Sequence, residues 1–98
     1  MKAILIDAEQ QSITETEVDN DQDIAALIGF DTIEADDVEP GHRLFFDEEC
    51  FLRGSKGRFQ LDKLIPISGK AVVVAISGET PGDVTLTLEE VTQRVKYV

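Results

Sequence analysis

Several residue types that would define a class of protein are scarce in this chain. Its 98 residues include no Trp, one Cys, one His and one Met, and aromatic residues make up only 6%. The single cysteine, Cys50, has no partner for an intramolecular disulfide or a zinc-binding pair, which indicates a reducing compartment. The composition therefore excludes disulfide scaffolds, and the core must consist mainly of aliphatic side chains.

Long apolar runs are also missing. The N-terminal segment has only four consecutive apolar residues, from Ala3 to Ile6, before the charge of Asp7. Such a run is too short for the apolar region of a secretory signal, and no other segment approaches the length of a membrane span. We therefore expect a cytoplasmic protein.

Basic residues are few, since nine Lys and Arg face twenty Asp and Glu, for a net charge of −11. This excess repels phosphate groups and argues against direct binding of nucleic acid or anionic membranes. Residues 1–50 hold fifteen acidic and two basic side chains, whereas residues 51–98 hold five and seven. The sequence predicts a polarised molecule, unless the fold interleaves the halves, and a basic charged partner.

What the chain does contain is typical of a single folded domain covering residues 1–98, with 42% hydrophobic residues, seven Gly and three Pro. Apolar patterns predict about six short strands, at residues 2–6, 12–18, 30–35, 43–46, 58–61 and 70–76. The last of these is the candidate for a central strand buried on both faces.

Two short helices are expected. One covers residues 24–28 behind capping residues at 19–21 and stops at Gly29, and the other begins at the capping box of Thr87 and Glu90. Strands and helices do not alternate regularly, so we predict an α+β fold with a small, mainly antiparallel sheet.

Local turns predict the connections. The first two strands should form a hairpin, and Pro40-Gly41 should turn the chain before residues 43–46. Residues 47–50 are expected to join that strand to a short strand at residues 51–53 in a second hairpin.

The acidic side chains are the main candidates for a functional surface. Regularly spaced carboxylates can imitate the phosphates of a duplex and occupy the basic groove of a nucleic-acid-binding protein. An acidic surface that serves only solubility is the competing interpretation. The candidate partner-binding residues are Glu15, Glu17, Asp19, Asp21, Asp23, Glu34, Asp36, Asp37 and Glu39.

Alternate carboxylates at residues 19–23 match the first positions of a calcium-binding loop. The rest of that pattern fails, because Ile24 stands where Gly is required and Phe30 stands where Glu is required. We interpret the segment as a helix cap and predict no metal or cofactor site, with loose binding of divalent cations by the acidic cluster as the open alternative.

His42 and Cys50 are the only residues that suggest nucleophilic catalysis. Around the expected hairpin they should lie about four strand steps apart, with Cys50 packed inside and His42 at the surface. We therefore predict a protein that is not an enzyme. A metal-binding or catalytic role for this pair with nearby carboxylates is a third hypothesis, which we rank below an interaction protein and a self-associating structural domain.

Four basic residues surround two aromatic ones in the second half of the chain, a mixture that accompanies base stacking in basic proteins. The overall acidity opposes that role here, so we expect this patch to balance the acidic half or to contact an acidic partner. The residues are Arg53, Lys56, Arg58, Lys63, Phe51 and Phe59.

The order of segments resembles a group of small uncharacterised acidic proteins encoded by bacteria, phages and plasmids. The similar segments are residues 1–7, 13–15, 23–29, 31–34 and 44–49, together with the helix that begins at Thr87. This resemblance implies a mobile-element or bacterial accessory context and transfers no functional residue. The group often has Gly near the position of Cys50.

These observations lead to two main functional hypotheses. In the first, a small acidic interaction protein binds a basic host protein that processes nucleic acid, with the acidic row as phosphate surrogates. In the second, a structural domain associates with itself through sheet edges, and its acidity serves solubility only.

Overall fold

The computed structural model describes all 98 residues and confirms the α+β class. A six-stranded antiparallel sheet contains β1 (Lys2–Asp7), β2 (Ser12–Glu17), β3 (Ile33–Glu39), β4 (His42–Asp47), β7 (Lys70–Ser77) and β8 (Thr80–Gly82). A three-stranded sheet contains β5 (Arg58–Leu61), β6 (Ile67–Ser68) and β9 (Val95–Tyr97). The helices are α1 (Asp21–Ile28), α2 (Leu88–Arg94) and the short 3₁₀ helix η1 (Cys50–Leu52).

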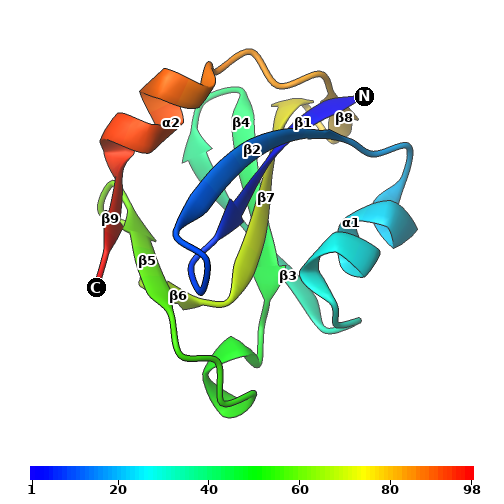
Figure 1. Cartoon of the computed structure of the whole chain (residues 1–98). Coiled ribbons are helices and arrows are strands. Elements are labelled where there is room, and N and C mark those ends of the chain that lie inside the picture. The colour runs from blue at the N-terminus through cyan, green and yellow to red at the C-terminus, as the bar shows by residue number, and fades with distance from the viewer.

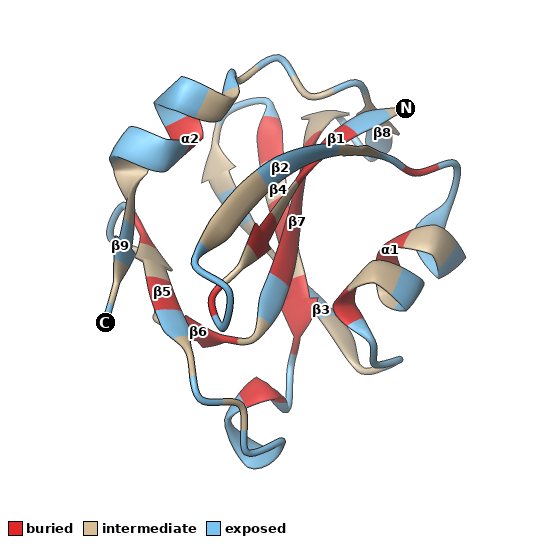
Figure 2. Cartoon of the chain, viewed as in Figure 1, coloured by how far each residue is buried: buried red, intermediate tan, exposed pale blue.

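The large sheet has the order β2-β1-β7-β4-β3, with β8 paired to β7. Its central strand is β7, as the apolar run predicts, and Figure 2 shows most of this strand as buried. Ala71 and Val73 belong to the core on one face of the sheet, and Val72 and Val74 to the core on the other. β1 and β2 form the expected hairpin, with Ile4 opposite Glu15. Because β7 lies between β1 and β4, the fold interleaves the acidic and basic halves of the chain.

The two faces of the large sheet carry separate cores. On one face Ile4, Leu44 and Val73 pack with Phe59 of the small sheet and Val91 of α2. On the other face α1 packs against the sheet. Figure 1 shows α1 on one side of the large sheet and the small sheet with α2 on the other. The side chains of this second cluster are Ala3, Val18, Ile24, Ile28, Val72 and Val74.

Both helices have the caps that the sequence predicts, although α1 begins at Asp21, three residues before the apolar segment at residues 24–28. The Asn20 side chain accepts a hydrogen bond from the Asp23 backbone N–H at the start of α1, and Gly29 ends the helix in a left-handed conformation. Thr87 and Glu90 form the complete capping box of α2. None of the helices has the length and the apolar composition of a membrane-spanning segment.

The predicted boundaries of one strand are wrong. Residues 30–32 precede β3, which begins at Ile33 and continues through the acidic residues to Glu39. The Ile33 N–H donates to the Asp31 carbonyl in a local turn. Arg43 and Arg94 pair with carboxylates of the strand, which offsets the repulsion that would otherwise oppose an acidic strand.

The predicted hairpin at residues 47–50 is also wrong. Both long sides of β4 are already paired, with β3 and β7, so no position remains for a strand at residues 51–53. The chain instead turns into η1, where the Asp47 carboxylate accepts hydrogen bonds from Glu49 N–H and Arg53 Nε. The chain after β4 therefore forms a hydrogen-bonded turn and not another strand.

Candidate functional site

The candidate partner-binding residues lie in three groups instead of one row. Those of β2 and those of β3 belong to opposite edges of the large sheet, four strand spacings or about 19 Å apart. The third group lies around the start of α1. The β2 group is Glu15 and Glu17, the α1 group is Asp19, Asp21 and Asp23, and the β3 group is Glu34, Asp36, Asp37 and Glu39.

Some of these carboxylates are already engaged within the molecule. Glu17 and Asp19 lie 3.5 and 4.0 Å from the N-terminal ammonium group. Asp23 accepts a hydrogen bond from the Asp19 N–H at 2.8 Å, in keeping with the helix-cap interpretation. On β3, Asp37 pairs with Arg43 at 2.9 Å and Glu39 with Arg94 at 3.0 Å. These five side chains therefore have partners of their own.

Glu34 and Asp36 form no ion pair with another side chain of this structure. Register places Glu34 opposite Phe46 and Asp36 opposite Leu44, so both carboxylates extend toward the same face of the sheet. They are two residues apart on a strand, which separates their Cα atoms by about 6.7 Å. One face of the edge strand β3 therefore carries two carboxylates without an ion pair.

A groove lies next to this edge, between α1 and the end of the sheet. It has a volume of about 350 Å³, and Ile24 and Ala25 of α1 together with Ile33 and Phe45 of the sheet supply its apolar lining. Two carboxylates, Asp21 and Asp31, also line it. Asp31, Ile33 and Phe45 were not among the sequence candidates, because only the docking of α1 beside β3 brings them together. We call β3 and this groove the β3 surface.

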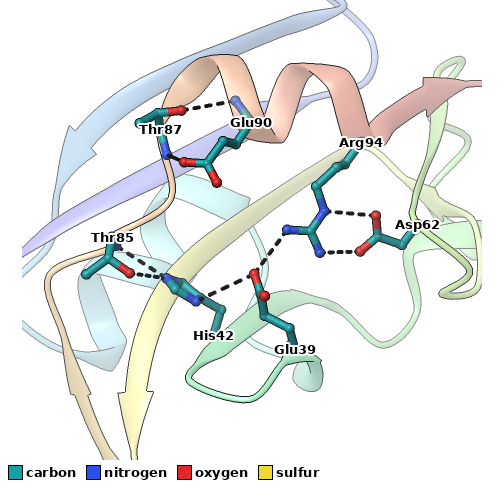
Figure 3. A network of polar contacts seen from close by, with 7 residues as sticks. All are labelled: Glu39, His42, Asp62, Thr85, Thr87, Glu90 and Arg94. Atoms are coloured by element: carbon teal, nitrogen blue, oxygen red, sulfur yellow. Dashed lines mark hydrogen bonds and ion pairs between the residues drawn. The ribbon is translucent and has the colours of Figure 1, made fainter.

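His42 is buried, contrary to the expected surface position, with 7% of its area exposed. Its Nε2 accepts from the Thr85 N–H at 3.3 Å and lies 3.0 Å from the Thr85 hydroxyl (Figure 3). A backbone N–H can only donate, so in neutral His42 the proton is on Nδ1. That atom has no hydrogen-bond partner and lies 3.9 Å from the Glu39 carboxylate.

The same carboxylate connects His42 to an arginine of α2. Arg94 donates to Glu39 at 3.0 Å and forms a two-pronged ion pair with Asp62 (Figure 3). These hydrogen bonds lower the pKa of Asp62, although partial burial opposes the change, and they raise the pKa of Arg94. The network fixes the end of β3 to α2 and to the turn after β5.

Cys50 is buried, as expected, and its Sγ accepts a hydrogen bond from the Ser68 N–H at 3.5 Å. It follows the far end of β4 from His42, and five strand steps, or about 17 Å, already separate His42 from Asp47. The structure does not bring the two residues together as a nucleophile and base. No group of three or more His, Cys, Asp or Glu side chains is arranged to hold a metal ion.

Part of the basic patch balances acidic residues of the first half. Arg53 pairs with Asp47 at 2.9 Å and with Glu49 at 3.3 Å, and its guanidinium lies 4.1 Å from the centre of the Phe30 ring. Burial of Asp47 opposes its ionisation, but hydrogen bonds from Arg53 and Thr32 prevail and lower the pKa of Asp47. The Arg53 guanidinium is thus paired with acidic groups of the same chain.

The two aromatic residues of the basic patch have different environments. Phe59 is completely buried in the core, whereas Phe51 is 52% exposed beneath the guanidinium of Arg58. They cannot form a shared stacking platform.

Comparisons of this chain with protein-family models, with curated proteins and with solved structures found no match. The resemblance to small bacterial, phage and plasmid proteins stays a prediction.

Proposed function

We propose that this chain is a small acidic interaction protein that binds a basic partner protein at the β3 surface. The observation that carries the proposal is the pair of uncompensated carboxylates, Glu34 and Asp36, on an edge strand beside a groove that also contains Asp21 and Asp31. Charges of one sign on a surface raise the encounter rate with a partner of opposite charge. A partner surface that is rich in lysine or arginine has the opposite charge.

The partner that fits best is a host protein that processes nucleic acid, because its binding groove is already cationic. In this proposal the carboxylates of β3 act as phosphate surrogates, and the protein competes with nucleic acid for the groove. The proposed setting is the cytoplasm, where a lone thiol such as Cys50 stays reduced.

The test is a pull-down from bacterial lysate with the tagged protein, washed at low and high salt and with competing duplex DNA. The variant carries Glu34→Lys and Asp36→Lys, and the matched control carries Glu15→Lys and Glu17→Lys on the opposite edge. Both changes alter the net charge by four, at opposite edges of the large sheet.

We expect a nucleic-acid-binding protein to be captured by the wild type and the β2 variant, released by DNA and high salt, and lost with the β3 variant. Equal capture by both variants would contradict the β3 surface. Capture that DNA does not reduce would contradict mimicry.

Self-association is the second candidate. Acidic edge strands would repel one another in an edge-to-edge dimer. However, η1 has two exposed apolar side chains, Phe51 and Leu52, and Leu52 is 80% exposed. Sedimentation of the wild type and of a Leu52→Glu variant tests this candidate. A wild-type dimer that the substitution converts to monomer would support it, and a wild-type monomer at micromolar concentration would exclude it.

A further inference from the structure

The outer side of β3 has no strand partner. The strand pairs with β4 on its inner side and ends the order of the large sheet. On β3, the Ala35 N–H donates to the side chain of its neighbour Glu34 at 3.2 Å, so this backbone group is not used in the β3–β4 ladder. The opposite edge strand, β2, has α2 packed close to it (Figure 1). The edge at β3 is therefore more open to an added strand than the edge at β2.

An unpaired strand edge is a template for another strand, because its N–H and C=O groups are spaced for ladder hydrogen bonds. On β3 the edge is seven residues long, with one irregularity between Asp37 and Glu39. A strand added to it would lie about 4.8 Å from β3. Its side chains would alternate between the two faces of the sheet.

The two faces of β3 require different side chains from such a strand. On one face its side chains would meet Glu34 and Asp36, which favours Lys or Arg. On the other face they would lie beside Ile33 and the groove between α1 and the sheet, whose lining is apolar with carboxylates at Asp21 and Asp31. Small β-branched side chains, or the aliphatic stem of a lysine, fit that face.

A second copy of this chain does not fit as the added strand. Its own open edge strand carries four acidic residues among seven, so an edge-to-edge pair would set carboxylates against carboxylates. The occupant must therefore come from a partner protein of opposite charge.

We propose that β3 accepts an extended segment of a basic partner protein as an added strand, in which basic residues alternate with apolar ones. This inference rests on the proposed function and adds the mode of recognition. Affinity comes from backbone hydrogen bonds and specificity from the alternating side chains. The Glu34 carboxylate gives up its contact with the Ala35 N–H when the strand binds.

The test is isothermal titration calorimetry with three synthetic heptapeptides of equal charge. The first alternates Lys and Val, the second has the same composition with the four Lys grouped together, and the third is the alternating peptide N-methylated at alternate residues on one edge. The proteins are the wild type, the variant with Glu34→Lys and Asp36→Lys, and the control with Glu15→Lys and Glu17→Lys. Circular dichroism checks that all three are folded.

We expect the wild type and the β2 control to bind the alternating peptide with similar affinity. The grouped peptide, the N-methylated peptide and the β3 variant should each weaken binding at least tenfold. Equal binding of all three peptides, still lost in the β3 variant, would overturn strand addition and leave the charge-based proposed function standing. Equal binding by both protein variants, or no binding at all, would overturn both.

Discussion

Arg94 joins three segments through one guanidinium group. It bonds Glu39 at the end of β3 and Asp62 after β5, and it lies in the last turn of α2. The position near the helix C-terminus also suits a cation, because the helix dipole is negative there. One partly buried side chain thus links the large sheet, the small sheet and a helix.

Replacement of Arg94 by Met keeps most of the aliphatic packing but removes the charge and its hydrogen bonds. We expect the free energy of unfolding at pH 7 to fall by about 1–2 kcal/mol, since charge-assisted hydrogen bonds are stronger than neutral ones. Urea unfolding measures the change. Lys96→Met, at a neighbouring exposed position with no ion pair, is the matched control and should change stability little.

The same substitution has an expected pH dependence. The pKa of Asp62 is lowered in the folded protein, so the carboxylate contributes stability above its ordinary pKa of 3.8 and loses it as the pH falls through the lower folded value. The stability difference between wild type and Arg94→Met should be constant near neutral pH and shrink in acid. A difference that grows on acidification would contradict the role of this pair.

Gly57 shows how one element depends on the close approach of another. A Cβ atom at this position would lie 2.3 Å from the Ala8 carbonyl oxygen and 2.6 Å from the Glu9 nitrogen. Both atoms belong to the backbone that joins β1 to β2, so a rotamer change cannot relieve the contact. The start of β5 therefore packs against the first hairpin only if residue 57 is Gly.

We expect Gly57→Ala to destabilise the fold by about 3 kcal/mol, at the upper end of the cost of overpacking. Gly82→Ala is the matched control, because nothing lies within 4 Å of its Cβ and its φ is not positive. Thermal unfolding followed by circular dichroism compares the two. Equal stability of both variants would show that the first hairpin can shift away from β5.

At the level of elements, features that depend on local patterns were predictable from the sequence. Features that depend on long-range strand pairing were not. The strand at 70–76, the first hairpin and both helix caps were predictable because apolar runs, turn residues and capping side chains act over a few residues. β6, β8 and β9 are two or three residues long, so no pattern marks them. The hairpin predicted at residues 47–50 is absent because β3 and β7 occupy both sides of β4, and no local pattern indicates these long-range pairings.

The candidate site was predictable only in composition. Charge counts singled out Glu34 and Asp36 along with seven other acidic residues, but sequence alone could not tell which of them have partners. Arg43 and Arg94 neutralise two neighbours on β3 through contacts that span 6 and 55 residues. The apolar groove lining at Ile33 and Phe45 gave no local signal, because alternation predicts burial without saying against what.

At the scale of the whole molecule, the charge halves of the sequence do not become two halves of the structure. β7 and α2 come from the less acidic half and pack among acidic segments of the other half, where Arg94 of α2 pairs with Glu39. The nine candidate carboxylates lie in separate groups at the two sheet edges and at α1. The partner surface that we propose therefore lies at one edge and not over a whole side of the protein.

The most direct measurement is a two-dimensional NMR titration of the ¹⁵N-labelled protein with the alternating Lys-Val heptapeptide. We predict that the backbone amides of Ala35 and Asp37 and of the α1 residues lining the groove shift and saturate together. Amides of β2 from Thr14 to Glu17 should stay unchanged. Shifts distributed equally over both sheet edges, or confined to β2, would contradict the assignment of β3 as the surface that binds a basic partner.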